Sequence, residues 1–325
     1  MKRLFVLMVI MAAAIAAAEA QRADSTVPDT PTAQQGQPAQ TGNQGAKQAA
    51  PAAQPPAQAG KNGRPMPAAK TPAEFKAYQD AVAKTTPAEV EAAAGAFSTQ
   101  YPQSELTMLI YRKAMYDYQM DNNGEKTVAM AKKVLALDPV NPEALVTFAT
   151  VTAQSTRETD LDRDERLNEA AADALKALQT INTDMLIPAN APPDRVEAFK
   201  NSLRAMAYDA LGTVAMVKKD YATAETNLSK STELNALPDA VTYLRLSVAL
   251  DQQKKYPQAL DAANKAVQYS ADSPQANNLA KLERDRLQKL VSAGGAAAPN
   301  SPAPTSPAPN SPAPATPPPA SKPPQ

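Results

Sequence analysis

The sequence predicts an all-α protein, a stack of helix hairpins held between two arms that form no core. Three observations support this fold class. Strong helix formers (Ala, Leu, Lys, Glu, Gln) dominate residues 71–292, where Gly occurs only three times. Within this stretch, a set of residues recurs at a spacing of 35. It also holds 14 of the 15 aromatic residues, whereas 20 of the 31 prolines lie in residues 21–70 and 293–325.

The first 20 residues have the pattern of a secretory signal peptide. Lys2 and Arg3 precede an apolar run over residues 4–18, and Ala18-Glu19-Ala20 matches an A-x-A cleavage site. The alternative is an uncleaved anchor, but 15 helical residues span only about 22 Å of a ~30 Å hydrocarbon core. We therefore expect an exported protein, periplasmic or secreted in the bacterial cell envelope, with no transmembrane segment after cleavage.

Composition excludes several kinds of chemistry. The chain has no His and no Cys, so it lacks Ser-His-Asp and Cys-His nucleophile systems, thiolate or imidazole zinc sites, disulfides and a lipid-attachment cysteine. Its 33 basic and 33 acidic residues balance, whereas a protein that binds nucleic acid regardless of sequence would show a basic excess. We expect no nucleic-acid partner and no cofactor.

Two segments of low complexity flank the helical region. Residues 21–70 are rich in Gln, Ala and Pro, and we expect a disordered linker there. Residues 293–325 carry a repeated Ser-Pro-Ala-Pro unit that favours polyproline II. This tail is either a plain spacer or a ligand for a proline-binding groove, and the repeated units lack the flanking Arg or Lys that usually orients such ligands.

The helices follow one another with short breaks. We expect eleven, over residues 72–84, 87–100, 104–120, 125–137, 142–155, 163–180, 194–218, 221–234, 239–253, 257–269 and 274–291. Five start at a proline, where the missing N–H is not needed: Pro72, Pro87, Pro142, Pro193 and Pro274. Four of these prolines follow an N-cap residue: Thr71, Thr86, Asn141 and Ser273. We see no convincing strand pattern.

The 35-residue spacing relates one helix hairpin to the next. The matched pairs are Tyr208 with Tyr243, Leu211 with Leu246, Tyr221 with Tyr256, Ala224 with Ala259, and Ser231 with Ala266. Gly212 follows Leu211, and Tyr111 fills the first of these positions in an earlier unit. Small residues are needed where the second helix crosses the first, and the Tyr and Leu side chains fill the wedge between helices.

These positions resemble the tetratricopeptide repeat, which implies a right-handed superhelical α-solenoid. The best repeats cover residues 205–239 and 240–273, weaker ones cover 104–139 and 142–181, and residues 274–291 form a capping helix within a domain of residues 71–292. In that helix we expect Leu279, Leu282, Leu287 and Leu290 to face inward. Residues 97–104 are similar to repeats of exported outer-membrane-assembly lipoproteins and of the periplasmic Tol–Pal partner.

The resemblance also indicates a binding surface. The first helix of each hairpin lines the concave face of such a stack. We call the residues expected there the inner wall: Arg112, Tyr116, Gln119, Met120, Val146, Thr150, Gln154, Asp209, Thr213, Met216, Leu244, Val248 and Asp251. This mixed apolar and polar set would suit an extended peptide or a partner helix. The alternative is that its apolar members pack against the long helix over 194–218.

No catalytic or metal-binding residue is assigned. The acidic run of residues 160–165 has the alternating oxygens of a calcium loop, but Glu165 and Ala171 stand where an EF-hand needs Gly and Glu. A solvated loop of mixed charge is the simpler interpretation. The predicted function is a non-enzymatic scaffold binding a protein or peptide. The alternative is a peptidoglycan- or carbohydrate-binding or enzymatic protein with a pocket near residues 181–200, against which the lack of His and Trp argues.

Overall fold

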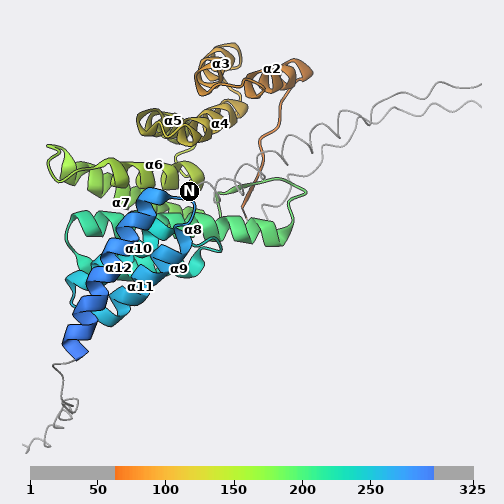
Figure 1. The fold of residues 1–325 in the computed structure, drawn as a ribbon. Coiled ribbons are helices and arrows are strands. Elements are labelled where there is room, and N and C mark those ends of the chain that lie inside the picture. Colours follow the sequence, from red (N-terminus) through yellow and green to blue (C-terminus); the bar gives the residue numbers. More distant parts are fainter. Residues whose placement is uncertain (1–62, 296–325) are drawn as a thin grey trace, which may run out of the picture.

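The computed structural model describes residues 63–295 and is an all-α stack of helix hairpins (Figure 1). The predicted signal peptide (1–20), most of the linker (21–70) and nearly all of the tail (293–325) lie outside the described residues. The helices are α2 (Pro72–Val82), α3 (Pro87–Gln100), α4 (Leu106–Met120), α5 (Gly124–Leu137), α6 (Pro142–Ser155), α7 (Arg163–Thr180), α8 (Pro193–Val217), α9 (Tyr221–Leu234), α10 (Ala240–Gln252), α11 (Tyr256–Tyr269) and α12 (Pro274–Gly295).

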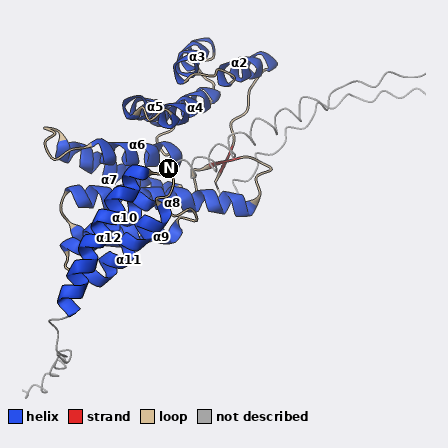
Figure 2. Ribbon diagram, viewed as in Figure 1, coloured by secondary structure: helices blue, strands red, loops and turns tan. Residues whose placement is uncertain are grey.

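Consecutive helices pair into five hairpins, α2–α3, α4–α5, α6–α7, α8–α9 and α10–α11, and α12 packs on the last of them. Figure 2 shows the hairpins as successive layers of helix. The expected helix boundaries agree within two residues, except that the last helix continues to Gly295. None of the described helices is both long and apolar enough to cross a membrane.

Local chemistry explains where the helices begin. The side chains of Thr71, Thr86 and Asn141 accept hydrogen bonds from the N–H groups of Glu74, Glu89 and Ala144, as expected of N-caps. Thr86 and Glu89 form a complete capping box, each satisfying a backbone N–H of the other. In each case a proline follows the cap, so the sequence specifies these three starts without tertiary help.

The turns inside three hairpins share one backbone conformation. Asn122, Lys219 and Lys254 have positive φ values of 55°, 61° and 61°. The residue after each donates its N–H to a carbonyl five residues back, as in Asp220 to Ala215 at 2.9 Å and Lys255 to Leu250 at 3.0 Å. The 35-residue sequence spacing between Lys219 and Lys254 is thus a structural repeat.

The repeated tyrosines occupy equivalent positions. A lysine lies 22 residues after each tyrosine and places its ammonium over the ring: Lys133 on Tyr111 at 6.0 Å, Lys230 on Tyr208 at 5.3 Å and Lys265 on Tyr243 at 5.8 Å. This confirms that Tyr208 and Tyr243 correspond in successive hairpins. The three lysines were not part of the predicted pattern.

The small residues lie where helices cross. Ala224, Ala259 and Ala266 are fully buried, and Leu246 is 8% exposed. Gly212 is required by close approach, because a Cβ there would lie 2.6 Å from Cγ of Leu228 on α9. The other repeat positions, Leu211, Tyr221 and Tyr256, are half-buried.

A short strand pair joins the segment before α2 to the segment before α8. Strand β1 (Arg64–Pro65) pairs in parallel with β2 (Leu186–Ile187), two residues each, where no strand was expected. The Arg64 guanidinium contacts Asp138 Oδ2 at 2.6 Å and donates to the carbonyl of Asp184 at 3.1 Å. This correction arises from long-range pairing, which local sequence does not encode.

Candidate functional site

The structure divides the inner wall into buried and accessible residues. Arg112, Val146, Thr150, Asp209 and Thr213 are buried; Tyr116, Gln119, Met216, Leu244, Val248 and Asp251 are half-buried; Met120 and Gln154 are exposed. The first group offers little side-chain surface to a partner in this conformation. All five lie on α4, α6 and α8, so α10 is the helix whose inner-wall residues all stay partly accessible.

Helix α8 explains part of this filling. It has 25 residues, against 13 to 15 in α4, α6 and α10. Its extra N-terminal turns and the preceding segment form an apolar cluster that half-buried Tyr116 and Met206 pack against: Ile181, Met185, Val196, Phe199 and Leu203. Val146 packs among alanines of α7 and α8, with no exposed area. At Val146, therefore, the apolar side chain packs against the long helix α8, which was the alternative to partner binding.

A buried ionic cluster joins α4 to α6. Arg112 Nη1 lies 3.1 Å from Glu143 Oε1, and the Tyr116 hydroxyl donates to the other oxygen of this carboxylate. Burial lowers the pKa of Arg112, but the charge and hydrogen bond of Glu143, together with Tyr116 and Tyr78, more than offset it, so this pKa is raised. Burial, together with the Glu143 charge, raises the pKa of Tyr116 well above 10.0. The cluster is internally satisfied and serves packing.

Ion pairs also join the later first helices. Arg245 of α10 lies 3.0 Å from Asp209 Oδ2 on α8, and the Thr242 hydroxyl donates to Asp209 Oδ1 at 2.9 Å. Arg286 of α12 lies 2.6 Å from Asp251 Oδ2 on α10. Both aspartates were predicted as partner-binding residues, but their carboxylates are used within the stack.

One apolar surface remains on the wall. Val241, Leu244 and Val248 follow at helical spacing on α10, are half-buried, and belong to none of the apolar clusters formed by the described residues. We call these three residues the α10 stripe. Elsewhere, Leu279 and Leu282 of α12 are 57% and 68% exposed, so their expected inward orientation is wrong; Leu287 is buried, and Leu290 packs against the same cluster.

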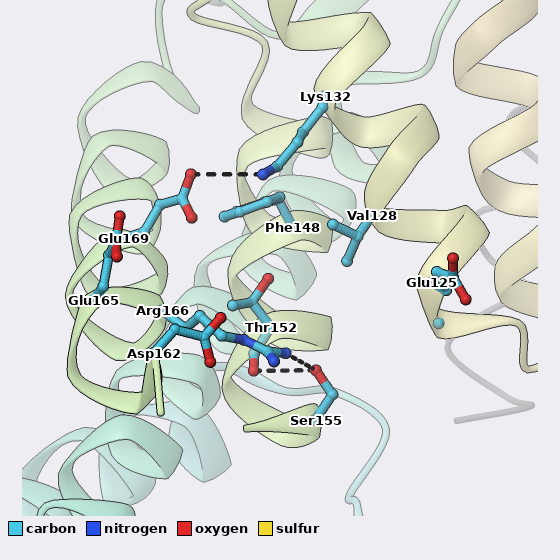
Figure 3. Close-up of a pocket in the computed structure, with 11 residues that line it drawn as sticks. Glu125, Val128, Lys132, Phe148, Thr152, Ser155, Asp162, Glu165, Arg166 and Glu169 are labelled. Atoms are coloured by element: carbon cyan, nitrogen blue, oxygen red, sulfur yellow. Dashed lines mark hydrogen bonds and ion pairs between the residues drawn. The ribbon is translucent and has the colours of Figure 1, made fainter. Parts of the chain in front are cut away.

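A cavity of about 640 Å³ lies on another part of the surface, between α5, α6 and α7 (Figure 3). We call it the outer groove, and the residues that line it include Glu125, Val128, Phe148, Thr152, Asp162 and Glu165. Lys132 and Arg166 also line it. Sequence reasoning missed this groove. The acidic run of residues 160–165 was the available signal, and it was interpreted only as a solvated loop.

The other candidate sites have structural explanations. Asp160 accepts a hydrogen bond from the Arg157 N–H at 2.8 Å and lies 3.7 Å from Arg166, as expected of a loop of mixed charge. No group of three or more His, Cys, Asp or Glu residues within residues 63–295 is arranged to hold a metal ion. In the segment proposed as an alternative pocket, Ile181, Met185 and Phe199 fill the core.

Comparison with known proteins assigns the chain to no family. No protein-family model and no curated protein matches it. A crystal structure of the MamA protein is similar with a TM-score of 0.36 and 19% identity, over 57% of this chain and 88% of that one. A second MamA structure is similar with a TM-score of 0.34 and 15% sequence identity, over 56% of this chain and 96% of that one. A chain of the APC/C hetero-tetramer Cut9–Hcn1 is similar with a TM-score of 0.32 and 16% sequence identity, over 67% of this chain and 42% of that chain. Because these scores are low, the assignment to stacked hairpins rests on the helix pairs and repeated turns of this chain.

Proposed function

We propose that this protein is a non-enzymatic scaffold of the bacterial cell envelope that binds an extended peptide or a partner helix on its inner wall. The observation that carries the proposal is the α10 stripe. Val241, Leu244 and Val248 present apolar surface at a spacing that matches one face of a helix, and the described core does not use them. Half-buried apolar rows of this kind are what helix-in-groove partners contact.

The neighbouring charges favour a bound segment over a small solute. Asp251 follows the stripe on α10 and is paired with Arg286, and Asp209 on α8 is paired with Arg245. Affinity on this face would therefore come from apolar burial, at about 25 cal/mol per Å² removed from water, with polar groups setting orientation. Met216 on α8 supplies an adaptable side chain on the same predicted wall.

The envelope setting is supported by the N-terminal sequence. Lys2 and Arg3, the apolar run over residues 4–18 and the A-x-A site are together typical of export. The similarity of residues 97–104 to repeats of periplasmic assembly proteins points to the same compartment. Fractionation of cells expressing the full chain, with N-terminal sequencing of the mature form, tests this: a mature protein starting at Gln21 in the envelope is expected, and an uncleaved cytoplasmic protein would contradict it.

The binding surface is tested by photo-crosslinking. A photoreactive residue at Leu244 should yield a discrete crosslinked partner, and Val248→Asp in the same chain should abolish it. The matched control places the photoreactive residue at Leu175 on α7, which is 51% exposed and lies outside the inner wall. Equal crosslinking from both positions, or crosslinking unaffected by Val248→Asp, would reject the α10 stripe. Arg112 and Tyr116 make poor test positions, because both hold the buried carboxylate of Glu143.

A further inference from the structure

The outer groove is a built concave site that the α10 stripe does not involve. Helices α5 and α7 form its two sides and α6 its floor (Figure 3). Its volume of about 640 Å³ lies within the range of pockets that bind ligands of several functional groups.

The floor combines apolar surface with a free hydroxyl. Phe148 is 2% exposed and half-buried Val128 lies beside it. Thr152 is 4% exposed, and in Figure 3 its side chain points into the groove. Its hydroxyl has no hydrogen-bond partner among the described residues, although Thr152's carbonyl accepts from Thr156 at 2.7 Å. This hydroxyl is therefore available to accept a hydrogen bond from a ligand in the groove.

The rim carries an excess of negative charge. Glu125, Asp162 and Glu165 are exposed and form no ion pair with any residue in the described range 63–295. The two cations of the groove are engaged: Lys132 lies 4.0 Å from Glu169, and Arg166 donates to Ser155 at 2.9 Å. The groove therefore has three carboxylates without a counter-charge within the described residues, and a cationic ligand would complement this charge.

The spread of these carboxylates indicates the size of that cation. Within residues 63–295 they do not converge as metal ligands do, since no group of three acidic side chains is arranged to hold an ion. A cation with an apolar stem would instead place its charge at the rim and its methylenes on Phe148 and Val128. Lysine and arginine side chains have this form.

The protein itself shows this mode of contact. The Lys132 ammonium lies 5.1 Å from the centre of the Phe148 ring, with Glu169 beside it. The Lys132 and Glu169 side chains are 59% and 49% exposed, so this surface ion pair is weak. The floor thus already accepts an ammonium group over its aromatic ring.

A fully exposed leucine stands next to the rim in sequence. Leu161 precedes Asp162 and has a relative exposure of 107%. A small polyamine would not use this side chain, whereas a protein segment crossing the rim would bury it. The exposed apolar side chain of Leu161 therefore favours a polypeptide as the source of the cation.

We propose that the outer groove binds an extended, lysine- or arginine-bearing segment of a partner protein, with its cation among Glu125, Asp162 and Glu165 and its stem on Phe148 and Val128. The segment also donates a hydrogen bond to the Thr152 hydroxyl and covers Leu161. This surface is distinct from the α10 stripe, so one chain would hold two partners, or two parts of one partner.

Fluorescence anisotropy of the full chain with a labelled peptide, acetyl-Ala-Lys-Ala-Lys-Leu-Ala-amide, tests the proposal. The double variant Asp162→Asn, Glu165→Gln should weaken binding roughly tenfold, the sum of two solvent-exposed charge contacts. Because the Asp162 side chain makes no capping hydrogen bond, this variant leaves the start of α7 intact. The matched control, Asp194→Asn with Glu233→Gln, removes the same charge from exposed positions on α8 and α9 and should bind as the wild type does.

Two further comparisons keep the proposal falsifiable. A peptide with Glu in place of both lysines should not bind, and Leu161→Ser should weaken the lysine peptide several-fold without affecting spermidine. Equal loss in the control variant, equal binding of the Glu peptide, no saturable binding in the millimolar range, or insensitivity of the peptide to Leu161→Ser would each overturn it. Failure here leaves the crosslinking result at Leu244 unaffected, so the two proposals are judged separately.

Discussion

Helices α6 and α10 are both the first helix of a hairpin, yet the corresponding face is buried in α6 and partly exposed in α10. At equivalent repeat positions α6 carries Val146 and Thr150, both buried, whereas α10 carries Leu244 and Val248, both half-buried. The difference comes from what covers them, since α7 and α8 pack along α6 and place alanines against Val146. A repeat register therefore assigns a face to a residue, but exposure of that face depends on the neighbouring elements.

The largest loss of stability should follow from breaking the buried ion pair between Arg112 of α4 and Glu143 of α6. Glu143→Ala leaves the Arg112 guanidinium buried without its counter-charge, and we expect a loss of about 3–5 kcal/mol in the free energy of unfolding. The double variant Arg112→Met, Glu143→Met should recover most of this loss, because no isolated charge remains. Chemical denaturation of the three proteins measures both values; an equal loss in the single and double variants would show that the charge is not the cause.

The comparison is sharpened by the same substitution in both helices. Val146→Ala removes two buried methyl groups and should cost about 2 kcal/mol, whereas Val248→Ala should cost under about 1 kcal/mol because its side chain already meets solvent. Denaturation midpoints with unchanged slopes give the two losses. Similar values would mean that the α10 stripe is as well packed as α6 and is unsuitable as a free surface.

The smallest effect concerns how the N-terminal hairpins respond to pH. The Tyr118 hydroxyl donates to Glu91 at 2.6 Å, and this hydrogen bond and Lys126 lower the pKa of Glu91 below 4.5 despite some burial. The same bond raises the pKa of Tyr118 to about 12. A lowered carboxyl pKa stabilises the fold above the unfolded value, and this contribution disappears as pH falls through the folded value.

Substitution of Glu91 isolates that contribution. Glu91→Gln should cost about 0.5–1 kcal/mol at pH 7, a modest value because the carboxylate lies near solvent and is screened. The difference from wild type should shrink below about pH 4. Urea denaturation at several pH values checks this. Glu89→Gln is a useful comparison, since Glu89 contacts only its own helix cap; a difference for Glu91→Gln that grows with acid would contradict the assignment.

Much of the fold could be predicted because its determinants are local. Prolines after capping residues specify helix starts, and Gly212 with Ala224 and Ala259 specifies close crossings. The candidate sites were less predictable. Asp209 and Asp251 look like free carboxylates in sequence, but their partners Arg245 and Arg286 come from the next element of the stack. The outer groove combines α5, α6 and α7, and no motif of a single segment announces it.

By itself, the sequence determined the all-α class, the order of the helices and the equivalence of Tyr208 and Tyr243, because caps, turns and small-residue positions act within one hairpin. The tertiary structure alone decided which surfaces are accessible. Burial of Val146, pairing of Arg112 with Glu143 and attachment of Arg64 to Asp138 each join residues that are distant along the chain. Exposure depends on such long-range packing, and a local pattern does not contain it.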